Sequence, residues 1–156
     1  MPPIKSLFLG ILAALFALFF ELSFSLFFPE EKQVVFFAHF SIFLILSALV
    51  EETVKYAVIY KSFSVLEKRR SIIFGGFLVG LGFSAAELSL NYYGKINLIS
   101  VPFYFLLGMI SVHIFTSIFA AMVISKKQNR YFMATRVLIF NSVIHILYNL
   151  AVIYLL

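Results

Sequence analysis

Five apolar stretches follow one another along the chain, separated by short polar segments. They cover residues 4–28, 34–60, 72–93, 97–124 and 134–156. About 20 residues of α-helix cross the ~30 Å hydrocarbon core of a bilayer, so each stretch is long enough to span a membrane. The pattern predicts an all-α polytopic membrane protein with five transmembrane helices. Because we find no internal repeat or soluble segment, we expect one membrane domain over residues 1–156.

Composition supports this class and excludes others. The chain is 63% hydrophobic and 12% charged, against roughly half apolar and a quarter charged in soluble domains. It has no cysteine, so disulfide and thiolate chemistry are excluded. The net charge of +5 does not indicate nucleic-acid binding, because the basic residues lie in short loops between apolar stretches.

The distribution of these basic residues predicts an orientation. With five spans, nine basic residues fall on one side of the membrane and two on the other. The first side has Lys5, Lys61, Lys68, Arg69, Arg70, Lys126, Lys127, Arg130 and Arg136, and the second has Lys32 and Lys95. Cytoplasmic loops carry the excess of lysine and arginine. We therefore expect a multi-pass protein of the cell membrane with its N-terminus in the cytoplasm and its C-terminus outside.

The second stretch contains three ionisable side chains, Glu51, Glu52 and Lys55. Thirteen Leu, Ile, Phe and Val residues between positions 36 and 60 favour insertion by roughly 4 to 8 kcal/mol. Three charges near the centre oppose insertion by roughly 7 to 10 kcal/mol. Such groups normally face a protein interior or a water-filled cavity and mark functional sites. The alternative is that Lys55 reaches the inner interface and the acids follow it into water.

The spacing within this stretch suggests that its two acids have different roles. Glu51 and Lys55 are four residues apart with the acid first, the favourable order for an ion pair on a helix. This predicts that Lys55 neutralises Glu51. Glu52, about 100° around the helix, is then the carboxylate left to act as base or metal ligand.

Each later stretch adds a polar group at membrane depth: Glu87, His113, and His145 with Asn149. Asn141, His145 and Asn149 recur every four residues and form one polar stripe. Each group also has a structural interpretation. Glu87 could be a carboxylate at the membrane interface, and His113 could be a hydrogen-bonded packing residue. The polar stripe could serve hydrogen bonding between helices. Gly76 and Gly80 have the spacing of close helix packing, with an unwound backbone as the alternative.

Together these groups predict a polar cavity inside the membrane. Carboxylates and imidazoles suit zinc or another divalent ion with an open position for water, and a glutamate beside that water serves as general base. Without metal, Glu52 activates water directly. Counted from the loops, Glu51 and Glu52 lie on the cytoplasmic side of their helix midpoint and Glu87 on the outer side of its own, so convergence requires helix tilt or helix boundaries that differ from this count.

The same residues resemble a known family. Glu51 to Lys55 match an EExxK motif, Phe83 to Glu87 an FxxxE motif, and His145 to Asn149 a terminal HxxxN motif, with His113 on the helix between. This ordered set resembles the PrsW-like intramembrane proteases of the CAAX prenyl endopeptidase and bacteriocin-processing superfamily. CAAX endopeptidases have histidine where Glu87 stands, which favours PrsW.

The resemblance implies a membrane protease with its catalytic core at residues 51–149. It implies that Glu51 and Glu52 form the water-activating pair, and that Glu87, His113, His145 and Asn149 bind metal or stabilise the transition state.

We therefore predict a peptidase for a membrane-anchored protein or peptide. In it Glu52 deprotonates water, and His113 and His145 hold the metal or the oxyanion. The predicted catalytic residues are Glu51, Glu52, His145 and Asn149, and the predicted metal ligands are Glu52, Glu87, His113 and His145. Two rivals remain: an ion or proton-coupled transporter or channel, and a catalytically silent binding or immunity protein.

Overall fold

The computed structural model describes residues 3–27, 35–37, 40–63, 69–93, 103–126 and 130–155. The described chain forms five helices and two short strands. The helices are α1 (Pro3–Phe27), α2 (Ile42–Phe63), α3 (Arg69–Tyr93), α4 (Phe103–Ser125) and α5 (Arg130–Leu155), and the strands are β1 (Val35–Phe37) and β2 (Phe40–Ser41). At 1.5 Å per residue, helices of 22 to 26 residues are about 33 to 39 Å long, enough to cross a bilayer.

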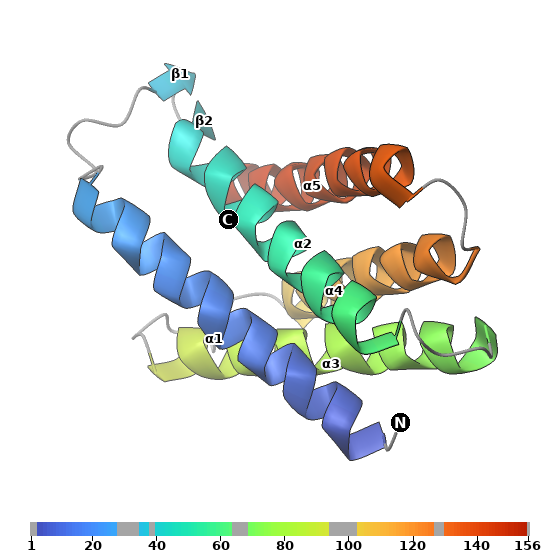
Figure 1. The fold of residues 1–156 in the computed structure, drawn as a ribbon. Helices are drawn as coiled ribbons and strands as arrows, with labels where there is room; N and C mark the ends of the chain where they lie inside the picture. Colours follow the sequence, from blue (N-terminus) through green and yellow to red (C-terminus); the bar gives the residue numbers. More distant parts are fainter. Residues whose placement is uncertain are drawn as a thin grey trace.

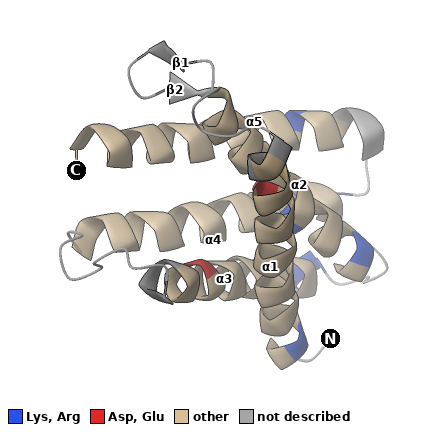
Figure 2. Ribbon diagram, turned by 90° about the vertical axis from the view of Figure 1, so that its left-hand side faces the viewer, with Lys and Arg blue, Asp and Glu red and all other residues tan. Residues whose placement is uncertain are grey.

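The helices form two crossed layers (Figure 1). Helices α3, α4 and α5 lie beside one another, with neighbours running in opposite directions, and α1 and α2 cross this layer (Figures 1 and 2). α1 packs mainly on α3, and α2 contacts α1, α4 and α5. Because α2 touches every other helix, its polar residues are placed at the centre of the bundle.

Four of the helices, α1, α3, α4 and α5, are long and apolar enough to cross a membrane. α2 is excluded from this set by its charges at Glu51, Glu52 and Lys55, although its length is sufficient. Two of these three side chains, Glu52 and Lys55, are each 1% exposed. The predicted all-α polytopic membrane fold is thus confirmed, with the charges of α2 turned into the protein.

The second predicted stretch differs from the structure at its beginning. It was expected to be helical from residue 34, but α2 begins at Ile42. β1 and β2 precede it as an antiparallel pair in which Val35 faces Ser41 and Phe37 faces Phe40. The reason is composition, since Val35–Phe37 is a β-branched and aromatic run that favours an extended backbone. Residues 97–102 of the fourth predicted stretch lie outside the described residues.

The bundle is apolar outside and partly polar inside. Large apolar side chains of α1 point outward, including Ile4 (81% exposed) and Phe19 (64% exposed), as expected of a lipid-facing surface. Apart from the buried Lys55, the described lysines and arginines gather on the side of the bundle where the N-terminus lies, and the C-terminus lies on the opposite side (Figure 2). This separation is the one expected for a chain with an odd number of spans.

Glycines allow α3 to approach both of its neighbours. A Cβ atom at Gly80 would lie 2.6 Å from the carbonyl oxygen of His113, and one at Gly76 would lie 2.8 Å from that of Ser117. A Cβ at Gly82 would collide with the backbone of Leu7 in α1. Since α3 is continuous through these positions, the packing interpretation of the glycines is confirmed.

Gly80 provides a test of this packing. Replacing it with valine is expected to destabilise the bundle by about 1 to 3 kcal/mol, because the added atoms overlap the α4 backbone and force α3 and α4 apart. Thermal unfolding in detergent, followed by circular dichroism, measures the loss. Ala85→Val is the matched control on an exposed face of α3. Equal stability of the two variants would contradict the close approach.

Candidate active site

A polar cluster lies where α2, α3, α4 and α5 meet. Its members are Glu51, Glu52, Lys55, Glu87, His113, Thr116 and His145. On α2 the buried positions are Leu44, Ala48, Glu52, Lys55, Ile59 and Phe63. Because these positions recur every three or four residues, they form one inward-facing stripe. Glu52 and Lys55 occupy its middle, so the acid and the lysine are built into the core of the bundle.

Lys55 makes the most contacts in the cluster. Its Nζ donates to Oε1 of Glu52 at 2.5 Å, to Nδ1 of His113 at 3.0 Å and to Oγ1 of Thr116 at 3.0 Å. It also lies 5.0 Å from the ring centroid of Phe83, within cation–π range. A lysine ammonium has three protons to donate, so all three are used.

The predicted pairing of Lys55 with Glu51 is therefore wrong. Lys55 pairs with Glu52, three residues back. The physical reason is tertiary, since the acceptors on α4, His113 and Thr116, draw the ammonium toward the Glu52 face of the helix. Glu51, not Glu52, is the carboxylate that Lys55 leaves without a hydrogen bond.

The contacts of His113 define its protonation. Lysine only donates, so Nδ1 of His113 accepts from Lys55 and the ring proton of the neutral imidazole lies on Nε2. Nε2 lies 2.5 Å from Oε2 of Glu87 and donates to it. Glu87 is thereby attached to the polar cluster while its side chain remains 30% exposed.

His145 has the opposite arrangement. Its Nδ1 lies 3.0 Å from Oε1 of Glu52 and donates to this carboxylate. When the ring is neutral, its lone pair is then on Nε2, which lies 3.9 Å from Oε2 of Glu51. The two imidazole rings stand edge to face with centroids 5.0 Å apart. One histidine thus presents a donor and the other an acceptor.

Asn149 is the predicted site residue that the structure does not bring into the cluster. It is half-buried, and no hydrogen bond or ion pair links it to the cluster within the described part of the chain. Asn141, one turn before His145, is buried instead and donates to the carbonyl oxygen of Thr116 at 2.9 Å. The polar stripe of α5 therefore bonds to α4 at one end and to Glu52 at its centre.

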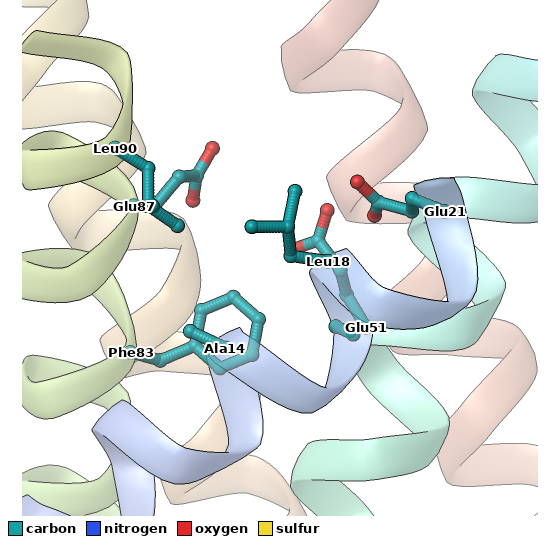
Figure 3. Close-up of a pocket in the computed structure, with 8 residues that line it drawn as sticks. Ala14, Leu18, Glu21, Glu51, Phe83, Glu87 and Leu90 are labelled. Carbon is teal, nitrogen blue, oxygen red and sulfur yellow. The ribbon is translucent and has the colours of Figure 1, made fainter. Parts of the chain in front are cut away.

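Beside the cluster lies a cavity of about 130 Å³, which we call the acidic cavity. It is lined by Ala14, Ala17, Leu18, Glu21, Glu51, Phe83, Glu87 and Leu90. The carboxylates of Glu21, Glu51 and Glu87 face this space from α1, α2 and α3 (Figure 3). Glu51 is 12% exposed and borders both the cavity and His145, so it links the space to the cluster.

The sequence interpretation missed Glu21 and Thr116. Glu21 carried a signal, since it is the one acid within the first apolar stretch. Thr116 carried none, because a threonine three residues after His113 is unremarkable until α2 brings Lys55 against it.

The donor set was tested for its fit to a metal ion. Glu51, His113 and His145 each offer a ligand atom within 4.8 Å of the others. Two imidazoles and a carboxylate are the protein ligands of one class of catalytic zinc site. Oε2 of Glu51 is buried without a hydrogen-bond partner, and Glu52 supports Nδ1 of His145 as carboxylates support zinc-binding histidines. The residues fit a metal, provided that the ring proton of His113 moves from Nε2 to Nδ1, so that His113 gives up both its hydrogen bond to Glu87 and the one from Lys55.

A comparison with protein families identifies the chain. The model of the PrsW family intramembrane metalloproteases matches residues 4–156. The chain belongs to the PrsW family. The resemblance found in the sequence motifs is thereby confirmed, and PrsW membership supports intramembrane protease activity at the level of the family. Searches of curated proteins and of solved structures found no match.

Lys55→Met tests whether the ammonium holds this PrsW site together. We expect a loss of about 3 to 5 kcal/mol, because removing one partner of a buried ion pair leaves Glu52 uncompensated. Thermal unfolding in detergent measures it. Lys61→Met, at an exposed position in the last turn of α2, is the matched control. The double variant Glu52→Gln/Lys55→Met should regain part of the loss, and a Lys55→Met protein as stable as its control would contradict this role.

Proposed function

We propose that this PrsW-family protein is an intramembrane peptidase that cleaves a membrane-anchored protein or peptide with water activated by a glutamate. One observation carries the proposal. Glu51 borders the acidic cavity and also faces Nε2 of His145, while its Oε2 has no hydrogen-bond partner. A carboxylate that can reach water on one side and an imidazole on the other is placed to move a proton between them.

Glu51 is assigned as the general base. It accepts a proton from water as the water oxygen forms a bond to the carbonyl carbon of the scissile peptide. Glu52 is less suited to this step, because its Oε1 already accepts from Lys55 and His145 and its side chain is 1% exposed. Its role in the proposal is to position His145.

The two histidines are assigned the other two roles, stabilising the oxyanion and protonating the leaving amine. Nε2–H of His113, which donates to Glu87 in this structure, is assigned to the carbonyl oxygen as negative charge develops there. Nε2 of His145 faces Glu51 and relays the proton to the leaving amine as the carbon–nitrogen bond breaks. Atoms and charges balance, since the proton taken from water ends on the amine.

If a metal is bound, Glu51, His113 and His145 would hold it. The ion would supply Lewis-acid polarisation of the carbonyl oxygen and a more acidic water. His113 would then release Glu87, whose carboxylate borders the same cavity and would be free to accept a proton.

The placement of the site indicates where the scissile bond lies, and the basic residues indicate how the protein is oriented in the membrane. Three of the four helices that hold the cluster, α3, α4 and α5, match membrane spans, so the scissile bond is proposed to lie at membrane depth. The end of the bundle that carries the basic residues (Figure 2) is proposed to face the cytoplasm, by the excess of lysine and arginine in cytoplasmic loops.

Glu51→Gln is expected to lower kcat for a membrane-anchored peptide by at least about 100-fold, since an amide cannot accept the proton. Its melting temperature should stay near that of the wild type, because Oε2 of Glu51 makes no hydrogen bond. Glu52→Gln should lose both activity and stability, since Lys55 and His145 bond to its carboxylate. The assay is peptide cleavage in proteoliposomes, with Thr53→Val, an exposed neighbour on α2, as control. A fully active Glu51→Gln protein, or ion flux without cleavage, would contradict the assignment.

Metal binding gives a separate test. Competition titration with a zinc-sensitive dye should show that His145→Gln weakens zinc binding by at least about tenfold, because its Nε2 is already free and supported by Glu52. His113→Gln should have a smaller effect, since His113 must first leave Glu87. Ser111→Ala, exposed on α4 and bonded only to the Leu107 carbonyl, serves as control. Unchanged zinc affinity in His145→Gln would rule out this ligand set.

A further inference from the structure

The acidic cavity lacks a cation of its own. Three carboxylates border it, from Glu21, Glu51 and Glu87, and no lysine or arginine is among its lining residues. Figure 3 shows the three carboxylates facing one space from three different helices. Lys55, the basic residue of the polar cluster, has its three protons on Glu52, His113 and Thr116. Nothing in the described lining neutralises the cavity.

Glu51 has one oxygen without a partner. Its side chain is 12% exposed and shares a hydrogen bond with Glu21, but its Oε2 is buried without a hydrogen bond. A buried carboxylate in a low-dielectric setting is costly unless a cation or donors compensate it. Glu87 has one donor, from His113, and its side chain remains 30% exposed toward the same space.

The other walls of the cavity decide which cation fits. Ala14, Leu18, Phe83 and Leu90 give it an apolar lining next to the acids. A lysine or arginine side chain has an apolar stem and a charged head, and buries the stem against such a surface. Phe83, whose ring centroid lies 5.0 Å from Nζ of Lys55, is the aromatic part of the same wall. A volume of about 130 Å³ equals about four water molecules at ~30 Å³ each, the scale of one extended side chain.

We propose that the acidic cavity is a subsite for a lysine or arginine side chain of the substrate, with Glu21 as its specificity-determining residue. The inference rests on the proposed peptidase function and names the class of substrate that it would prefer. Because Glu51 borders both the cavity and His145, the basic residue of the substrate lies close to the scissile bond. Glu21 lies on α1, outside the four helices that form the polar cluster, and its side chain shares a hydrogen bond with Glu51, so it lies at the border between the subsite and the proposed base.

The test uses apolar membrane-spanning peptides that carry one tryptophan and, at successive positions, lysine, arginine or norleucine. The chain itself has no tryptophan, so peptide fluorescence in nanodiscs reports binding without background. We expect one position at which lysine or arginine raises both affinity and kcat/KM over norleucine by at least about tenfold, as desolvated charge pairs do. Glu21→Gln should reduce this ratio by at least about fivefold, and Glu21→Lys, which supplies its own ammonium, should abolish it.

Ser23→Ala is the matched control on α1, since its hydroxyl bonds only to the carbonyl oxygen of Phe19, and it should keep the wild-type ratio. Cleavage without preference for a basic residue, or a preference that survives both Glu21 variants, would overturn the subsite and leave the peptidase intact. Binding with a basic preference but no cleavage by the wild type would overturn the peptidase and support the subsite. Melting temperatures of the Glu21 variants separate loss of preference from loss of fold.

Discussion

The structure depends on one buried ammonium and its three acceptors. Lys55 is 1% exposed in the middle of an apolar bundle, where an unpaired charge would cost several kcal/mol. It is tolerated because each of its protons ends on an acceptor, one on its own helix and two on α4. The acceptors are then fixed by the same bonds. The charge that makes α2 unsuitable for lipid on its own therefore connects α2 to α4 and, through Glu52, to α5.

Close helix packing is the second requirement, and it follows from the first. The hydrogen bond between Glu87 on α3 and His113 on α4 needs two backbones that approach closely, and glycines on α3 supply that approach. Gly80 packs against the backbone of His113 itself. The position of the imidazole is therefore fixed by α3, which contacts its backbone, and by Lys55, which donates to its ring. A larger residue at Gly80 would therefore disturb the site as well as the fold.

Much of the fold follows from the sequence, because long apolar runs fix the number of spans and the glycine spacing indicates packing. The convergence of Glu51, Glu87, His113 and His145 was also predictable, since ionisable groups in four spans avoid lipid. The hydrogen-bond partners of these side chains could not be predicted. Helix spacing assigned Lys55 to Glu51, but acceptors on α4, distant in sequence, direct it to Glu52. Likewise, the start of α2 at Ile42 reflects the extended backbone before it, which an apolar count cannot detect.

The polar cluster leaves two carboxylate oxygens without hydrogen-bond partners, Oε2 of Glu51 and Oε2 of Glu52. Buried polar atoms without partners are uncommon in native proteins and call for an explanation. In Glu52 the unpaired Oε2 is tolerated because the other carboxylate oxygen, Oε1, accepts from Lys55, His145 and Thr116. Glu51 has less compensation, since its side chain shares a hydrogen bond with another acid, Glu21, and its Oε2 borders the acidic cavity without a bond. Such an oxygen persists in a membrane bundle when something that enters the cavity completes it, and a substrate, a metal or a water to be deprotonated each meet that condition at Glu51.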